Sequence, residues 1–199
     1  MQLGLFAMGG PSVDVGAHPE RLDLGGGAWV EMRRGWLRGA DDLGQMLMAT
    51  VPWQHHRRWM FDRVVDEPRL SCWYRDAAEL PGPGLVEAAH QLSALYHRPL
   101  VGPGLNYYRD GRDSVAFHAD RELRYLDDTV VAIVTLGATR PFLVRPQGGG
   151  RSVDFRPGTG DLLVMGGSCQ LLYEHAVPKV ASSGPRVSAS WRWAWRPSR

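Results

Sequence analysis

The pair His118-x-Asp120 restricts the fold of this chain more than any other feature of its sequence. In a β-strand, residues i and i+2 point to the same face, so an imidazole and a carboxylate at this spacing can reach one metal ion. Two protein ligands do not complete a metal site, and His175 is the best candidate for a third. A fold that carries such a site must bring together two strands that are far apart in the sequence.

On its own, a His-x-Asp pair is a weak signal, because it is more often a surface histidine beside a solvated aspartate. Two histidines and one carboxylate, however, are the ligand set that leaves coordination positions open in non-haem Fe(II) oxygenases. A second pattern supports a binding site: Arg186 and Arg192 lie six residues apart and would share one face of a strand. Unpaired buried charge is costly, so these guanidinium groups require anions, which a small dicarboxylate would supply.

Four motifs follow one another in a definite order along the second half of the chain. They are Asn106-x-Tyr108-x-x-Gly111, His118-x-Asp120-x-Glu122, the distal His175, and Arg186-x-Ser188-x-Ser190-x-Arg192. In this order they resemble the AlkB family of Fe(II)/2-oxoglutarate dioxygenases. The resemblance covers the C-terminal half of the chain well and the N-terminal half loosely.

The resemblance implies Fe(II) as the metal and 2-oxoglutarate and O₂ as cosubstrates. His118, Asp120 and His175 would bind the iron, and no catalytic residue beyond these ligands is expected. The residues implied to contact 2-oxoglutarate are Asn106, Tyr108, Arg186, Ser188, Ser190 and Arg192. Arg186 would pair with the distal carboxylate and Arg192 would lie near the carboxylate that is lost as CO₂. The family often has Asn and Thr where this chain has the two serines, so the contacts of those serines stay open.

The implied reaction is oxidative demethylation of an N-alkylated base in DNA, of the 1-methyladenine or 3-methylcytosine type. It releases formaldehyde, succinate and CO₂, and the base must leave the stack to reach the iron. Glu122 matches an acidic position that contacts the flipped base in the family, where a carboxylate would favour a cationic lesion. The alternative is that Glu122 is a solvated carboxylate in a turn.

Aromatic and basic residues alternate densely across residues 53–63 and 67–76. This pattern fits a nucleic-acid surface, on which aromatics stack and arginines hold phosphates. It also fits a strand pair with core aromatics and solvated charges. The resemblance implies a substrate lid here, with Phe61 and Met60 as a wedge. The residues predicted to contact substrate are Glu122, Trp73, Tyr74, Phe61, Arg69 and Arg145. Because Trp73 and Tyr74 are neighbours, at most one of them should face the pocket.

The remaining pattern predicts an α+β, mainly β fold with a double-stranded β-helix (jelly-roll) core, N-terminal helices and a substrate lid. Asp41 and Asp42 are expected to cap a first helix, and residues 85–97 form a second, amphipathic one. Strands are expected at 28–32, 129–136, 140–145, 151–155, 162–165, around His175, and at 186–195. We expect one domain over 1–199, with an irregular N-terminus (1–25), a lid with supporting helices (26–98) and the jelly-roll core (99–199).

The composition is that of an ordinary globular protein, with 44% hydrophobic and 22% charged residues among 199. No apolar run is long enough to span a membrane, and the N-terminus lacks the features of a signal peptide. The only cysteines, Cys72 and Cys169, are expected to be reduced thiols. These features predict a cytoplasmic monomer that does not bind membranes. The net charge of +2 does not by itself indicate a nucleic-acid binder.

Other functions stay open at this stage. The same chemistry could act on RNA, tRNA or protein, although the aromatic and basic segment favours a nucleic acid and the compact form favours DNA. The chain could instead be a non-catalytic β-sandwich that binds nucleic acid, with a vestigial His-x-Asp pair. Intact Arg186 and Arg192 argue against that class. They also have no role in a third class, the cupin-like zinc or manganese proteins.

Overall fold

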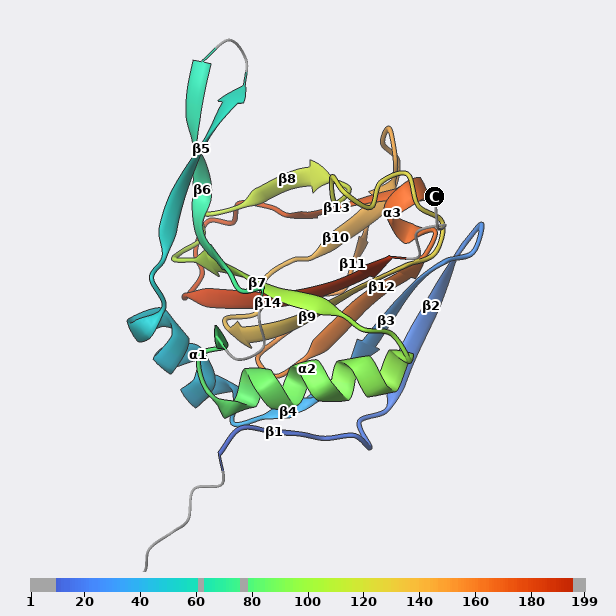
Figure 1. The fold of residues 1–199 in the computed structure, drawn as a ribbon. Helices are drawn as coiled ribbons and strands as arrows, with labels where there is room; N and C mark the ends of the chain where they lie inside the picture. Colours follow the sequence, from blue (N-terminus) through green and yellow to red (C-terminus); the bar gives the residue numbers. More distant parts are fainter. Residues whose placement is uncertain (1–9, 61–62, 76–78, 195–199) are drawn as a thin grey trace, which may run out of the picture.

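The chain forms two antiparallel β-sheets that lie face to face, with two helices against the outer side of the larger sheet (Figure 1). The computed structural model describes residues 10–60, 63–75 and 79–194. The larger sheet holds, in spatial order, β2 (Pro19–Gly25), β3 (Ala28–Arg33), β12 (Leu162–Gly167), β9 (Thr129–Gly137), β14 (Arg186–Ala194), β7 (Val101–Tyr108), β6 (Arg63–Trp73) and β5 (Gln54–Met60). The smaller sheet holds β11 (Val153–Asp154), β10 (Leu143–Pro146), β13 (Tyr173–Val177) and β8 (Val115–His118). The predicted mainly β, jelly-roll architecture is confirmed.

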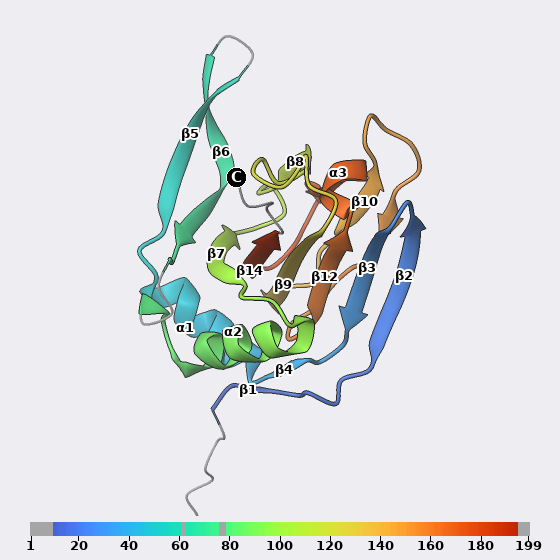
Figure 2. The same ribbon diagram turned by 45° about the vertical axis from the view of Figure 1, so that its right-hand side comes forward.

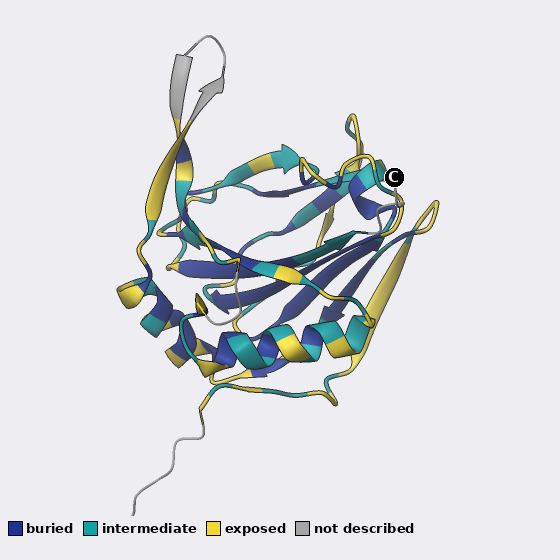
Figure 3. Cartoon of the chain, viewed as in Figure 1, coloured by how far each residue is buried: buried dark blue, intermediate teal, exposed yellow. Residues whose placement is uncertain are grey.

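Strand β9 is apolar on both faces because it separates two hydrophobic cores. Ala132, Val134 and Leu136 face the core between the larger sheet and the helices. Val131 and Ile133 face the second core, between the two sheets. A strand buried on both faces reads as a continuous apolar run rather than an alternating one. Figure 3 shows the resulting band of buried residues through the central strands.

Helices α1 (Ala40–Thr50) and α2 (Pro83–Tyr96) cover the outer face of the larger sheet. In α2, the buried residues Leu85, Ala88 and Leu92 recur at the helical spacing of three and four. That helix begins with a proline, two residues earlier than predicted, and proline suits the first helical turn. The predicted cap of α1 is wrong: Gly39 is the N-cap, and the two aspartates lie in the first turn, where they complement the helix dipole.

The N-terminal segment differs from the prediction, because Pro19–Gly25 form a strand rather than irregular chain. Strand β2 is an edge strand whose side chains are almost all exposed, as Figure 3 shows. It therefore lacks the alternation of apolar and polar residues that marks a strand in sequence. Its order comes from backbone pairing with β3 and from Arg21, whose guanidinium lies 3.5 Å from the Trp29 ring centroid. A shorter pair, β1 (Ser12–Val13) and β4 (Leu37–Arg38), lies beside the helices.

Strands β5 and β6 form an antiparallel hairpin that projects beyond the rest of the molecule in both views (Figures 1 and 2). The segment with alternating aromatic and basic residues is therefore a strand pair attached to the edge of the larger sheet through β7. Both cysteines are free thiols. None of the described helices is both long enough and apolar enough to span a membrane.

Candidate active site

His118, Asp120 and His175 meet at one end of the space between the two sheets. Each residue offers one ligand atom, and these atoms lie within 4.8 Å of one another. His118 ends β8 and lies directly opposite His175 on the neighbouring strand β13, with their ring centroids 4.3 Å apart. The strand register thus joins residues that are far apart in the sequence, and the structure brings the three predicted metal ligands together.

Both histidines are held in orientations that leave a ring nitrogen for a metal. The Nδ1 atom of His118 lies 2.9 Å from the carbonyl oxygen of Ala116, so Nε2 is the atom turned toward the carboxylate. His175 is buried and stacks on Phe142, with ring centroids 5.6 Å apart. Burial lowers the pKa of His175 to about 3, so its imidazole stays neutral, and the neutral form is the one that binds a metal.

Asp120 is held by its side chain and by its backbone. Burial would raise the pKa of this carboxyl group, but the charge and hydrogen bond of Arg192, with the two histidines, bring it to about 2. Arg192 Nε donates to Oδ2 at 2.6 Å, which leaves Oδ1 facing His118 Nε2 at 3.8 Å. The buried backbone N–H of Asp120 donates to Oε1 of Gln170 at 2.7 Å. An ionised carboxylate and two imidazoles are a ligand set that fits an iron with open coordination positions.

Arg186 is the strongest sign of an anion site. Its side chain is fully buried, and Nε and Nη1 have no hydrogen-bond partner within the described part of the chain. Only Nη2 has a partner, donating to Thr135 Oγ1 at 3.2 Å. Burial lowers the pKa of Arg186 to about 10, which still leaves the guanidinium charged at neutral pH. A buried guanidinium with free N–H groups is costly unless an anion binds it, so these N–H groups fit one carboxylate of 2-oxoglutarate.

The six residues predicted to contact 2-oxoglutarate share one face of the larger sheet. On β14 these are Arg186, Ser188, Ser190 and Arg192, and the register places Tyr108 opposite Arg186 and Asn106 opposite Ser188. Ser190 donates to the carbonyl oxygen of Gly104 and accepts from Arg192 Nη1, so its hydroxyl orients Arg192. Trp191 lies one residue out of phase with these four side chains, so it points to the other face, where it is fully buried in the core under the helices.

A polar cavity of about 270 Å³ lies beside this face, under the β5–β6 hairpin. Its lining residues are His56, Arg57, Glu67, Arg69, Ser71, Trp73 and Asn106. Arg69 Nε donates to Asn106 Oδ1 at 2.9 Å, and Arg69 pairs with Glu67 at 3.0 Å. Trp73 is 57% exposed, and the Arg192 guanidinium lies 4.9 Å from its ring centroid. A chain of contacts from Trp73 through Arg192 to Asp120 links the wall of this cavity to the metal cluster.

The structure places two of the predicted substrate contacts, Tyr74 and Arg145, away from the metal cluster. Tyr74 packs against the core on the helix side of the larger sheet, because it follows Trp73 and points the opposite way. Arg145 lies on the outer face of the smaller sheet, since its neighbour Val144 points into the core between the sheets. There it pairs with Glu174 at 2.7 Å and stacks on Phe117.

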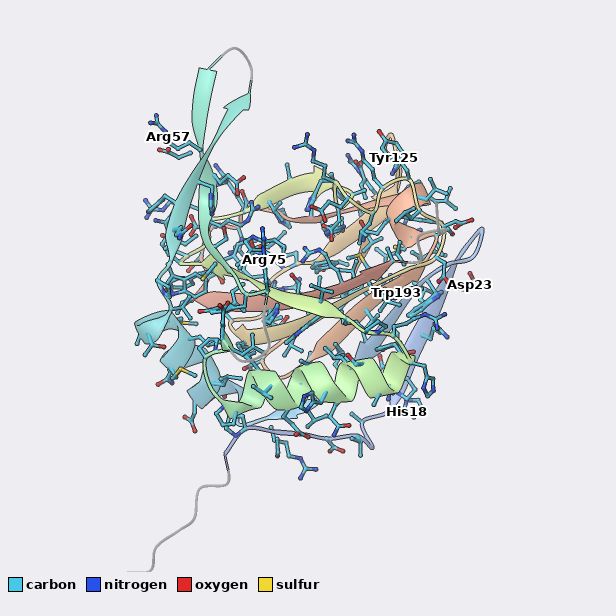
Figure 4. The ribbon with its side chains drawn as sticks, in the orientation of Figure 1. His18, Asp23, Arg57, Arg75, Tyr125 and Trp193 are labelled. Carbon is cyan, nitrogen blue, oxygen red and sulfur yellow. The ribbon has the colours of Figure 1, made fainter. Side chains whose placement is uncertain are left out.

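The remaining predicted contacts have different outcomes. Glu122 is exposed in the turn after Asp120, which agrees with both interpretations of that residue. Phe61 lies outside the described residues, as does the side chain of its predicted partner in the wedge, Met60. Figure 4 shows Arg57 on the hairpin and Tyr125 in the loop after β8, on opposite sides of the upper end of the molecule.

Two buried polar residues near the site were missed by the sequence analysis. Arg140 is fully buried and donates to the carbonyl oxygens of Asp110, Asp113 and Pro178, which ties together the loops beside β7, β8 and β13. Gln170 is 1% exposed and holds the backbone of Asp120. The sequence did contain a signal for Gln170, because this glutamine is flanked by apolar residues and lies five positions before the candidate ligand His175. No local sequence pattern marked Arg140.

The fold and the arrangement of the site define an oxygenase class. Residues 85–192 match the family model of the 2OG-Fe(II) oxygenase superfamily, so the chain belongs to that superfamily. A prolyl hydroxylase from Trichoplax adhaerens superposes with a TM-score of 0.63 at 11% identity, covering 83% of each chain. A Pseudomonas putida prolyl-4-hydroxylase gives a TM-score of 0.61 at 13% identity, covering 84% of this chain and 93% of the other. At these identities the likeness concerns the fold alone.

Sequence similarity narrows the class further. The chain is 30% identical over 180 residues to alpha-ketoglutarate-dependent dioxygenase alkB homolog 3 of Mus musculus, covering 78% of this chain and 62% of the relative. This similarity supports the AlkB-family resemblance that the order of the motifs predicted within the superfamily. Members of the superfamily work with Fe(II), 2-oxoglutarate and O₂, and the His-Asp-His cluster fits that set. The chain spans about three fifths (62%) of the length of this relative.

Proposed function

We propose that this protein is an oxidative demethylase that removes N-linked methyl groups from alkylated bases in DNA, of the 1-methyladenine or 3-methylcytosine type. The observation that carries the proposal is the buried Arg186, with two N–H groups that lack a partner among described residues, on the same face as Arg192 and next to the metal cluster. The likeness to AlkB homolog 3 supports the same chemistry.

The site residues divide into a metal set and a cosubstrate set. In this proposal His118, Asp120 and His175 hold Fe(II), and Arg186 holds the distal carboxylate of 2-oxoglutarate through Nε and Nη1. Arg192 keeps one oxygen of Asp120 occupied, which leaves the other for the metal. When bound, the iron and 2-oxoglutarate would supply, with O₂ as the oxidant, the oxidation of the methyl carbon, which would leave as formaldehyde, with succinate and CO₂ as by-products.

The protein contributes a dry site and fixed donor positions. Burial of His175 and Asp120 excludes water from one side of the metal cluster, which strengthens the electrostatic interactions there. Ser190 holds Arg192, so the guanidinium does not have to reorganise when the cosubstrate binds. Tyr108 is buried beside Arg186, with its ring centroid 5.8 Å from the guanidinium, so it borders the proposed cosubstrate position.

The cavity under the hairpin is the proposed entry for a flipped base. Trp73 offers an exposed ring on which a base can stack, and stacking is tolerant of base identity. Arg69 and Glu67 lie on the same wall and can meet the polar edge of the base. Arg57 and Glu122 remain proposed contacts at the rim, to phosphate and to a cationic lesion respectively.

The proposal is tested on purified protein in two stages. Fe(II) and 2-oxoglutarate are added without oxygen, and we expect a weak visible charge-transfer band that is lost in His118→Ala. The control His90→Ala removes an exposed histidine of α2 and should keep the band. Air and a 1-methyladenine oligonucleotide are then added, in DNA and RNA versions, and formaldehyde is measured. Absence of the band contradicts the metal assignment. A band with formaldehyde from RNA only moves the substrate to RNA.

A further inference from the structure

Gln170 connects the two segments that carry the metal ligands. It belongs to the short helix α3 (Cys169–Leu172), which leads directly into β13 and His175. Its side chain reaches across to the segment of Asp120, where Oε1 accepts the backbone N–H of that residue at 2.7 Å. We propose that Gln170 is a positioning residue for the iron, and that it sets where the Asp120 carboxylate stands relative to the two histidines. The inference rests on the proposed ligand assignment.

The position of Asp120 depends on its backbone because the residue lies where strand β8 has already ended. The carbonyl oxygen of Asp120 accepts from the N–H groups of Leu123 and Arg124 and so begins the following turn. Its own N–H has no strand partner and is buried, and Gln170 is what satisfies it. A buried donor without a partner is costly, so loss of this acceptor would shift the backbone toward a new partner.

Gln170 itself is anchored from several sides, so its position is well defined. It is 1% exposed, and its backbone carbonyl oxygen accepts from Gln147 Nε2 at 3.4 Å. The neighbouring Ser168 donates to the carbonyl oxygen of Gly26, and the hydroxyl of Tyr173 donates to that of Leu24. These bonds fix α3 to the turn between β2 and β3. Through Gln170, that part of the larger sheet supports the metal loop.

Arg192 and Gln170 restrain Asp120 at different atoms. Arg192 binds the carboxylate oxygen Oδ2, whereas Gln170 binds the backbone nitrogen. The first contact sets the charge and rotation of the carboxylate, and the second sets the distance of the whole residue from His118 and His175. Residues that orient metal ligands in this way contribute 10–100-fold to metal affinity. We therefore expect a loss of that order when the acceptor is removed.

The test compares Gln170→Met with Gln147→Met. Methionine keeps the length and shape of glutamine but has no oxygen to accept the N–H of Asp120. Gln147 is an exposed glutamine whose side chain donates to the backbone of Gln170 and not to Asp120, so it is a matched control. The dissociation constant of Fe(II), the charge-transfer band with 2-oxoglutarate and the melting temperature of the apoprotein are measured without oxygen. We expect ~10–100-fold weaker metal binding and a shifted band in Gln170→Met alone.

The outcomes separate a positioning role of Gln170 from a purely structural one. A folded Gln170→Met protein with the metal affinity and band of the wild type overturns the inference. A lower melting temperature with unchanged affinity and band also overturns it, because the role is then structural only. If Gln170→Met does not fold, Gln170→Asn is measured in its place, since it keeps the amide but shortens its reach, and the same expectations apply. His118→Ala is run alongside: if it binds iron normally, the ligand assignment fails rather than the role of Gln170.

Discussion

The metal end of the jelly roll and the β5–β6 hairpin use polar residues in opposite ways. At the metal end, His175, Arg186 and Ser188 are at most 6% exposed. On the hairpin, the side chains of the ion pair Arg57–Asp66 are 68% and 73% exposed, and Trp73 is 57% exposed. Burial of polar groups is costly, so those in the metal site must be satisfied by each other or by what they bind. Exposed charges carry no such requirement. The buried polar groups of the metal site therefore indicate which ligands they bind. The exposed charges of the hairpin indicate no ligand by themselves, and the hairpin is assigned a role mainly because it lies beside the site.

The strongest way to test this comparison is to replace the two fully buried arginines. Arg186→Met should weaken 2-oxoglutarate binding at least ~30-fold, because truncating one partner of a buried charge pair costs about 2–5 kcal/mol. The free energy of unfolding of the apoprotein should not fall, since Arg186 has two N–H groups without partners among described residues. Arg140→Met should instead lower the free energy of unfolding by ~3 kcal/mol or more, because three carbonyl oxygens lose their hydrogen-bond donor.

The affinity for 2-oxoglutarate is measured by calorimetric titration of the protein loaded with Mn(II) in place of iron. The free energy of unfolding is measured with urea. If the two variants lose stability to the same extent, the distinction between a binding arginine and a structural one fails.

The second prediction concerns the metal alone. Mn(II) added to the apoprotein at a hundredfold excess over its dissociation constant should stabilise it by about 2.7 kcal/mol, because only the folded state has the site. A chelator should reverse the effect, and Asp120→Asn should abolish it. Trp73→Leu should retain it in full, since the His-Asp-His cluster includes none of the described hairpin residues. Thermal unfolding gives the answer, and an undiminished shift in Asp120→Asn would contradict the metal assignment.

The third prediction separates two neighbouring aromatic residues. Trp73→Leu should raise KM for alkylated DNA, because stacking on an aromatic contributes about 1–3 kcal/mol per base. Its melting temperature should change little, as the ring is mostly exposed. Tyr74→Leu should do the reverse, with a lower melting temperature and an unchanged KM, because its ring packs on the helix-side core. If KM rises for Tyr74→Leu and not for Trp73→Leu, then Tyr74 rather than Trp73 is the ring on which the base stacks.

The smallest effect is expected on the hairpin surface. Arg57→Gln should weaken DNA binding equally for alkylated and normal sequences and reduce the slope of log affinity against log salt by about 1, as one phosphate contact is lost. Arg38→Gln is the control, since Arg38 is also exposed and ion-paired but lies on β4, away from the hairpin in Figure 1. Fluorescence anisotropy over a salt series distinguishes them. Equal slopes for both variants would remove the hairpin from the binding surface.

Much of the site could be predicted because it depends on local alternation. Arg186, Ser188, Ser190 and Arg192 share a face whatever the strand packs against, and Trp191 must then face the other way. The same rule said that Trp73 and Tyr74 could not both face the pocket, but it did not say which one does. The edge strand β2 escaped prediction because its side chains are exposed, so burial left no pattern in its sequence.

By itself, the sequence determined the ligand types, their spacing and the mainly β class, because residue chemistry and strand periodicity are local properties. Only the tertiary structure decided that Arg186 keeps two N–H groups without partners among the described residues, whereas Arg140 donates to three carbonyl oxygens. It also decided that Arg145 faces outward and that Gln170 reaches Asp120. These outcomes depend on the register of strands that are distant in the sequence, and that register is set by packing of the whole sheet rather than by neighbouring residues.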